Sequence, residues 1–287
     1  MGREFLFQHY LVVFLDILGQ RESLRQITAL PINEEEKSKF IDAIKQNLGK
    51  VRRIRKYFKD YFDAADSYNP NINLVAPEHH EEFLASQKFE IFFYGFSDSI
   101  VIYIPLMGND ENCTAINGVF SAFVATSGTG LFALSDKIPV RGGLDIGIAT
   151  AIEEKEIYGP ALERAVHLEH QIAEYPRFVI GKELLNYLSW VVNQNCASPF
   201  GEIARNGALF CKEMIIRDTD GRYMLDFLGP KLNELVGNPI DGETVIAARN
   251  FAEEEYKKYT EQNNEKLMSR YFRLLKYFSY RNDVWKL

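Results

Sequence analysis

The sequence predicts an α+β fold that combines buried strands with long amphipathic helices. Residues 9–20, HYLVVFLDILGQ, form an almost continuous apolar run rich in β-branched residues, as in a strand buried on both faces. Residues 89–94 and 99–104 predict two further strands joined by a short turn. Apolar residues at helical spacing over 33–65 predict a long helix. No repeat or linker divides the chain, so we expect one elaborated domain over residues 1–287.

The composition is that of an ordinary globular protein, with 46% hydrophobic and 25% charged residues. The formal net charge of −7 argues against general affinity for nucleic acid or an anionic membrane surface. Cys113, Cys196 and Cys211 have no metal-ligand spacing and are too few for a disulfide framework. No segment reaches the ~18 uninterrupted apolar residues of a membrane span, and the N-terminus has no cleavage-type signal. We therefore expect a soluble, cytoplasmic protein.

Asp16 and Gly19 close the first strand and make its end the first candidate site. A carboxylate in so apolar a segment is costly unless a cation or hydrogen bonds compensate it. The backbone N–H groups of Leu18, Gly19 and Gln20 follow directly, and this combination suits a metal-bound phosphate. The alternative is that Asp16 merely caps the next helix, over Gln20–Leu30.

Asn33 and Glu36 form a capping pair for a helix that runs to about residue 65. Its apolar residues predict packing along the whole helix, and the basic residues between them read as a solvated face. The apolar residues are Phe40, Ile41, Ile44, Leu48, Val51, Ile54, Phe58, Tyr61 and Phe62. Residues 67–87 read as a loop, in which the adjacent pair His79–His80 lacks further metal ligands.

The strands Phe89–Tyr94 and Ser99–Ile104 are joined by Gly95-Phe96-Ser97-Asp98, a tight turn with an acid at its tip. A helix over Cys113–Leu134 should then cover one face of the sheet. Val140–Ile152 is another strand, whose glycines allow close backbone approach, and Pro160 begins the next helix.

That helix places Glu163, His167, His170 and Glu174 on one face, which we interpret as a polar outer face rather than a zinc site. The segment Asp218-Thr219-Asp220-Gly221 is expected to be a hairpin turn, because it is far too short for a calcium loop. The other elements predicted for this half are a strand Phe178–Ile180, a helix through Trp190, hairpin strands Leu209–Ile216 and Tyr223–Leu228, and a charged helix from Glu243 to about Tyr280, broken near Asn263-Asn264.

Three segments together carry a family resemblance: FLDILG at 14–19, FSDSIVIYIP at 96–105 and RGGLDIGIATAIEEKEIYGPALERAVHLE at 141–169. Their order and spacing resemble the catalytic domain of class III nucleotidyl cyclases, and most of all the bacterial pyrimidine cyclases of Pycsar antiphage defence. The resemblance covers about residues 7–230. It implies a ferredoxin-like βαββαβ core, with a helical insertion at about 33–87 and a long C-terminal helical extension at about 243–287. It also implies a head-to-tail homodimer with composite active sites.

Carried over residue by residue, the resemblance makes Asp16 and Asp98 the metal-binding aspartates, and Ile17 the residue that lends a backbone carbonyl. Two divalent cations, Mn²⁺ or Mg²⁺, would bind the triphosphate and favour attack of the ribose 3′-hydroxyl on the α-phosphorus. The backbone of Leu18 to Gln20 would hold the phosphates.

The base-reading positions depart from those of the purine enzymes. Tyr94 stands where adenylate cyclases use Lys, and Glu156 stands at their adenine-selecting Asp. An aromatic ring narrows the pocket and offers a stacking face, which fits a pyrimidine, although Tyr94 is equally well explained as a core strand residue. The transition-state Asn and Arg of many class III enzymes fall at Glu163 and His167, which are poor substitutes. The candidates for the missing positive charge are Arg141, Lys155 and Arg164.

The leading hypothesis is a metal-dependent cyclase that converts UTP or CTP to cUMP or cCMP and pyrophosphate. The product would be a second messenger in antiphage defence that acts on a separate effector. One alternative is a weak or inactive cyclase-like nucleotide sensor, which Glu163 and His167 favour. Another is a purine cyclase, which Tyr94 disfavours.

Overall fold

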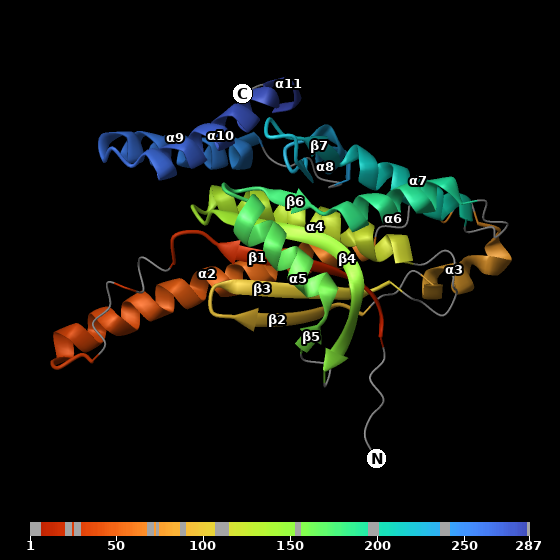
Figure 1. Cartoon of the computed structure of the whole chain (residues 1–287), viewed down its shortest axis with the longest axis horizontal. Coiled ribbons are helices and arrows are strands. Elements are labelled where there is room, and N and C mark those ends of the chain that lie inside the picture. Colours follow the sequence, from red (N-terminus) through yellow and green to blue (C-terminus); the bar gives the residue numbers. More distant parts are fainter. Residues whose placement is uncertain are drawn as a thin grey trace, which may run out of the picture.

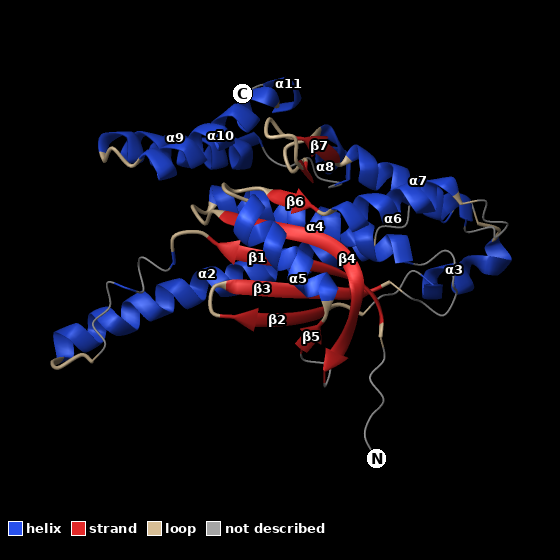
Figure 2. Ribbon diagram, in the orientation of Figure 1, coloured by secondary structure: helices blue, strands red, loops and turns tan. Residues whose placement is uncertain are grey.

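The computed structural model of the chain describes residues 7–20, 25, 30–67, 72, 75–86, 90–106, 115–152, 156–194, 201–235 and 242–285 (Figure 1). In chain order the elements are β1 (Gln8–Ile17), α2 (Glu34–Asp66), η2 (Pro77–His79), α3 (His80–Ser86), β2 (Phe92–Phe96), β3 (Ser99–Pro105), α4 (Ala115–Ser135), β4 (Val140–Ile152), β5 (Glu156–Tyr158), α5 (Pro160–His167), η3 (Leu168–Ile172), β6 (Phe178–Ile180), α6 (Lys182–Asn193), α7 (Gly201–Glu213), β7 (Ile215–Arg217), β8 (Tyr223–Leu225), α8 (Pro230–Leu235), α9 (Gly242–Glu261), α10 (Glu265–Tyr280) and α11 (Asn282–Trp285). Figure 2 shows helices packed around a single sheet, which confirms the predicted α+β class.

The strands form one eight-stranded mixed sheet in the order β2-β3-β1-β4-β6-β8-β7, with β5 paired to β4. Strand β1 is antiparallel to both of its neighbours, β3 and β4, and β2 is antiparallel to β3. Strand β4 is parallel to β6. Along the chain, α2 and α3 connect β1 to β2, and α4 connects β3 to β4. The first four strands and their helical connections therefore follow the order βαββαβ.

Strand β1 is buried on both faces, as predicted. Its odd-numbered residues from Leu11 to Ile17 belong to the main hydrophobic core, together with side chains of α2 and α4. Its even-numbered residues from Tyr10 to Phe14 belong to a smaller apolar cluster with residues of α5. Because side chains alternate along a strand, Asp16 lies on the α5 side of the sheet.

Helix α2 begins as the sequence predicts. The Asn33 side chain accepts from the Glu36 N–H at 2.9 Å, and the Glu36 carboxylate accepts from the Ile32 N–H at 2.8 Å. The Asn33 side chain thus satisfies a backbone donor that the start of a helix leaves without a partner, and Glu36 fixes the residue that precedes the cap.

Helix α2 packs on the rest of the protein from about Asn47 onward. Its buried apolar residues there, which include Val51, Ile54 and Phe58, contact the core beneath α4. The first half extends away from the sheet (Figure 1). Ile41, Ile44 and Leu48 are 47%, 40% and 45% exposed, so packing along the whole length is a wrong prediction. Periodicity shows that a helix has an apolar face, but not how far its neighbours extend.

Strands β2 and β3 form the predicted hairpin, but β2 ends two residues later than expected. The turn is therefore Ser97 and Asp98 alone, with Ser97 at a φ of 56°. Strand β4 has the predicted bounds, and its glycines do allow close approach. A Cβ at Gly143 would lie 2.3 Å from the Ala165 carbonyl oxygen of α5. Phe89 and most of the predicted helix Gln20–Leu30 lie outside the described residues.

The predicted strand Leu209–Ile216 is mostly helix. Helix α7 occupies Gly201–Glu213, and only Ile215–Arg217 is a strand. A short apolar run cannot distinguish a strand from a buried helix, and the helical spacing of buried Ala204, Ala208 and Cys211 resolves the ambiguity.

The C-terminal helix is broken where the sequence predicts. Asn263 has a φ of 52°, and the Asn264 side chain caps α10 by accepting from the Leu267 N–H at 3.2 Å. Helices α9 and α10 consequently pack against each other, and α9 packs on α4.

Among the described residues, one helix, Ile116–Ser135 within α4, is long and apolar enough to cross a membrane. However, 83% of its apolar window is buried inside the protein, because the sheet and the helices α2, α7 and α9 cover it. Such burial is typical of the core helix of a soluble protein. The cytoplasmic location stays a prediction.

Candidate active site

The end of β1 and the β2–β3 turn bring Asp16 and Asp98 to one edge of the sheet. Asp16 is the register partner of Ser99, whose hydroxyl donates to its carboxylate at 3.1 Å. The Ile17 N–H donates to the Asp98 carbonyl at 3.4 Å. Both aspartates are largely buried, with 7% of Asp16 and 6% of Asp98 exposed. The three residues assigned to metal binding from the sequence therefore lie next to one another.

The two carboxylates differ in what neutralises them. Asp16 faces Arg141, its register partner on β4, whose Nη2 lies 3.6 Å from the Asp16 Oδ2. The Asp98 carboxylate makes no hydrogen bond or ion pair with any residue that the structure describes. Asp98 is largely buried as a residue, but its carboxylate oxygens are not fully buried, so an ion can reach them. The arrangement therefore favours a cation from outside the chain.

Arg141 is held in place from a second direction. Its Nε lies 2.6 Å from Oε1 of Glu169, in an ion pair rather than an aligned hydrogen bond, and its Nη1 donates to the Ala173 carbonyl at 3.3 Å. Glu169 is 2% exposed and belongs to the site, but the sequence analysis does not predict it as a site residue. The available signal is its spacing, since Ala161, Ala165 and Glu169 recur every four residues on one buried helix face.

The turn after β1 offers fewer free backbone donors than predicted for phosphate binding. The Leu18 N–H already donates to the Pro139 carbonyl at 2.9 Å, so this N–H is not a free donor for a phosphate. The Gln20 side chain is buried and donates to the Asn47 carbonyl of α2 at 3.1 Å. Gly19 has a φ of 88°, and a Cβ there would meet no atom of the described residues within 4 Å. Gly19 is thus not covered by any residue that the structure describes.

The base-reading candidates do not lie together within one chain. Tyr94 is half-buried on the edge strand β2 opposite Val101, in the apolar cluster on the Asp16 side of the sheet. Glu156 begins β5 and pairs with Ile152, whereas Arg141 lies at the other end of β4. The two ends are separated by roughly 35 Å of extended strand. Within a single chain, Tyr94 lies near the same end of the sheet as Asp16, and Glu156 lies near the other end.

The other proposed sources of positive charge are separated in the same way. Lys155 lies outside the described residues. The Arg164 Nη1 donates to the Ile146 carbonyl at 3.1 Å, near the middle of β4. Glu163 and His167 are exposed on the outer face of α5, as a polar face predicts. No group of three or more His, Cys, Asp or Glu that could hold a metal occurs within the described ranges, so a zinc site on α5 gains no support.

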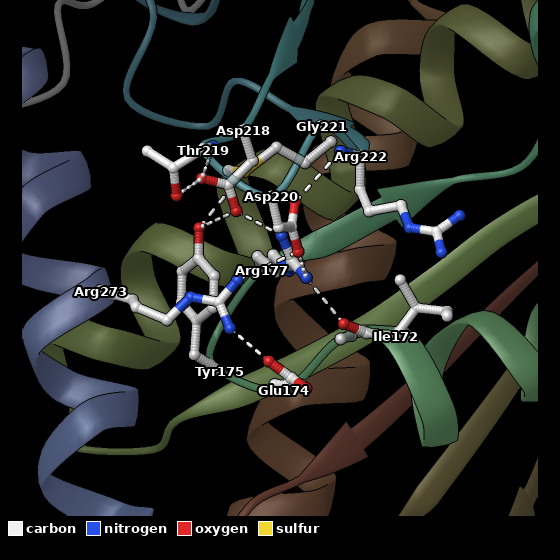
Figure 3. Close-up of polar contacts among 12 residues, drawn as sticks. Ile172, Glu174, Tyr175, Arg177, Asp218, Thr219, Asp220, Gly221, Arg222 and Arg273 are labelled. Atoms are coloured by element: carbon white, nitrogen blue, oxygen red, sulfur yellow. Dashed lines mark hydrogen bonds and ion pairs between the residues drawn. The ribbon is translucent and has the colours of Figure 1, made fainter.

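A second pair of aspartates, Asp218 and Asp220, lies in the predicted β7–β8 turn and is fully paired (Figure 3). The buried Arg177 donates to both carboxylates, at 2.6 Å for Asp220. The Tyr175 hydroxyl donates to Asp218 at 2.8 Å, and Arg273 of α10 donates to Asp220 at 3.0 Å. This turn cross-links the hairpin, the segment before β6 and helix α10.

The oxygens at the Asp16 edge fit divalent cations. Carboxylate and backbone carbonyl groups are the ligands that Mg²⁺ and Mn²⁺ prefer, and Asp98 offers a carboxylate that the described chain leaves unneutralised. A scan of the chain against protein-family models and a search of the curated proteins both find no match. The cyclase resemblance therefore rests on the sequence motifs and stays a prediction.

Proposed function

We propose that the protein is a metal-dependent nucleotidyl cyclase that converts UTP or CTP to cUMP or cCMP and pyrophosphate. The observation that carries this proposal is the carboxylate of the largely buried Asp98, which adjoins Asp16 and has no partner among the described residues. The order βαββαβ of the first four strands and their helical connections supports the same family. The expected product is a second messenger for a separate effector protein in antiphage defence.

In this reaction the ribose 3′-oxygen forms a bond to the α-phosphorus of the same nucleotide. The bond from that phosphorus to the bridging oxygen of the β-phosphate breaks, pyrophosphate leaves, and the hydroxyl proton passes to water. Two divalent cations held by Asp16, Asp98 and the Ile17 carbonyl would favour ionisation of the hydroxyl and screen the triphosphate charge. Arg141 adds fixed positive charge beside Asp16. Tyr94, on the same face of the sheet, offers a stacking surface for a one-ring base.

A homodimer is part of the proposal. Glu156 lies at the far end of β4 from the metal-binding edge, so a site that uses both needs Glu156 from a second copy. Exposed apolar side chains support such an association. They include Phe96 beside the site and Tyr158 on β5, which are 72% and 70% exposed.

A cyclase-like sensor that binds nucleotide without turnover is the second candidate. Glu163 and His167 occupy the positions of the transition-state Asn and Arg, and neither supplies a fixed guanidinium. The sensor would keep the metal and phosphate contacts at the Asp16 edge but would lack charge stabilisation in the transition state.

Product analysis tests these proposals. Purified protein is incubated with each of the four nucleoside triphosphates and Mn²⁺, and products and bound nucleotides are identified by mass spectrometry. We expect cUMP or cCMP in stoichiometric amounts with pyrophosphate, and none from the Asp98→Asn variant. Bound nucleotide without product would favour the sensor, and cAMP or cGMP would favour a purine cyclase. If no product forms and no nucleotide binds, the proposed function is contradicted.

A further inference from the structure

Three arginines converge on the last residue of η3 and the two residues that follow it. Their side chains donate to three consecutive carbonyl groups: Arg177 Nη2 to Ile172 at 2.7 Å, Arg141 Nη1 to Ala173 at 3.3 Å, and Arg270 Nε to Glu174 at 3.1 Å. Consecutive Cα atoms are 3.8 Å apart. Arg270, which belongs to α10, is therefore a close neighbour of Arg141 and of the Asp16 edge.

Arg270 differs from the other two arginines in its charge partners. Arg177 is paired with Asp218 and Asp220, and Arg141 with Asp16 and Glu169. Arg270 forms no ion pair with a described residue, and its two terminal nitrogens, Nη1 and Nη2, have no hydrogen-bond partner there.

The surroundings of Arg270 favour an anion. Burial and the nearby positive charge of Arg141 lower the pKa of the Arg270 guanidinium, and the negative charge of Asp16 opposes that effect in part. An arginine stays charged at neutral pH despite such a shift. A second anion near both guanidiniums would relieve their repulsion and use the free donors of Arg270.

We infer that Arg270 binds the phosphates of the nucleotide, so that helix α10 completes a phosphate site otherwise built from the β1 turn and Arg141. This inference rests on the proposed function. The planar guanidinium presents two parallel N–H donors that match two phosphate oxygens. Gly19 lies in the turn after β1, and no atom of the described residues is within 4 Å of its Cβ position, so this part of the turn is available to the phosphate chain. The contact would make the C-terminal helices a part of the active site, although they lie outside the segments that carry the family resemblance.

Inorganic tripolyphosphate is the probe that separates this inference from catalysis. Its affinity is measured by calorimetry in EDTA for the full-length protein and three variants. Arg270→Gln keeps a donor for the Glu174 carbonyl but removes the charge, and Arg270→Lys keeps the charge but removes the planar fork. Arg249→Gln is the matched control, because Arg249 lies on α9 and, among the described residues, is paired with Glu253 alone.

We expect Arg270→Gln to weaken tripolyphosphate binding by roughly 10- to 100-fold, the size of one or two charge-assisted hydrogen bonds. Arg270→Lys should lose several-fold, and Arg249→Gln should bind like the unchanged protein. Melting temperatures identify any variant that does not fold. If Arg270→Gln does not fold, the tripolyphosphate affinity of Arg270→Lys decides whether Arg270 binds phosphate.

The inference is overturned if the unchanged protein does not bind tripolyphosphate. It is also overturned if both folded Arg270 variants bind it normally, or if the Arg249 control loses as much affinity. Cyclisation of UTP with unaltered KM in both Arg270 variants would reject Arg270 while leaving the cyclase intact. Conversely, Arg270-dependent tripolyphosphate binding without any nucleotide turnover would support the phosphate site and reject the cyclase.

Discussion

Two pairs of aspartates lie at strand ends and turns of the same sheet, and they differ in how their charge is neutralised. Asp218 and Asp220 accept hydrogen bonds from Arg177, Arg273 and Tyr175. The negative charge of that turn is therefore neutralised within the chain. Asp98, in the β2–β3 turn, is buried but has no partner among the described residues. A carboxylate that the chain neutralises holds the structure together, whereas one that it leaves unneutralised points to a ligand.

The two regions are connected through the last residue of η3 and the residue that follows it. Arg177 from the paired region and Arg141 from the candidate site donate to adjacent carbonyls, those of Ile172 and Ala173. The paired turn therefore fixes the backbone against which Arg141 is positioned. We expect changes in the paired turn to act on activity only through the stability of this support.

The largest expected effect on activity comes from a comparison of two single variants, each of which removes one carboxylate charge from one of the two pairs. Asp98→Asn should lower turnover by roughly 1,000-fold or more, beyond the 10- to 100-fold of changes outside the metal ligands. Its melting temperature should stay the same or rise, since an unneutralised and largely buried carboxylate is removed. Asp218→Asn should instead lower the melting temperature and keep the activity of each folded molecule. Steady-state rates and thermal melts of both variants check this contrast.

Asp16→Asn is the companion to that experiment. It should also abolish turnover, but with some loss of stability, because Arg141 and the Ser99 hydroxyl lose a charged partner. Normal activity in either the Asp16 or the Asp98 variant would remove the basis of the metal assignment.

Removal of the buried arginine should produce the largest change in stability. Arg177→Met leaves Asp218 and Asp220 without their main partner, and breaking a buried pair in this way costs roughly 3–5 kcal/mol. Adding Asp218→Asn and Asp220→Asn to the same chain should recover part of that loss. Urea unfolding of the single and triple variants measures both effects. A loss below about 1 kcal/mol would show that the cross-link matters little.

A smaller effect is expected at Tyr94. Because the ring is half-buried on an edge strand, Tyr94→Ala should cost less than the roughly 3–5 kcal/mol of a fully buried aromatic residue. Loss of a stacking contact should shift the UTP-to-ATP activity ratio by roughly ten-fold. Tyr94→Phe keeps the ring and serves as the control. An unchanged ratio in a destabilised Tyr94→Ala variant would assign Tyr94 to the core alone.

The smallest effect concerns pH. Burial raises the pKa of Asp220, but hydrogen bonds from Arg177 and the Arg222 N–H outweigh burial and lower the pKa to about 2. An unfolded Asp titrates near ~3.9. The stability that Asp220 contributes is therefore present above pH ~4 and is lost as the pH falls toward 2. Urea unfolding at several pH values should show a shallower acid dependence for Asp220→Asn than for the unchanged protein, and equal slopes would contradict the pairing.

Local patterns in the sequence predict local structure well here. The apolar run around Asp16, the Asn33 and Glu36 cap and the bounds of Val140–Ile152 all appear as expected. These features depend on residues that are neighbours in the chain, and a single sequence records them directly.

Features that depend on distant segments do not follow from the sequence. No pattern near Arg270 indicates that it lies beside Arg141, because the contact joins segments that are far apart in the chain. The Leu18 N–H is taken by the Pro139 carbonyl from another part of the chain. The exposed first half of α2 reflects the extent of its neighbours rather than its own pattern.

Binding of Mn²⁺ tests most directly the claim that Asp98, together with Asp16, forms the ligand site and that Asp218 and Asp220 do not. Electron paramagnetic resonance counts bound Mn²⁺ in the presence of UTP for the unchanged protein, Asp98→Asn and Asp218→Asn, each shown to be folded. We expect bound Mn²⁺ in the unchanged protein and in Asp218→Asn, and its loss in Asp98→Asn. Equal Mn²⁺ binding by Asp98→Asn and the unchanged protein would contradict the account, as would loss in Asp218→Asn alone.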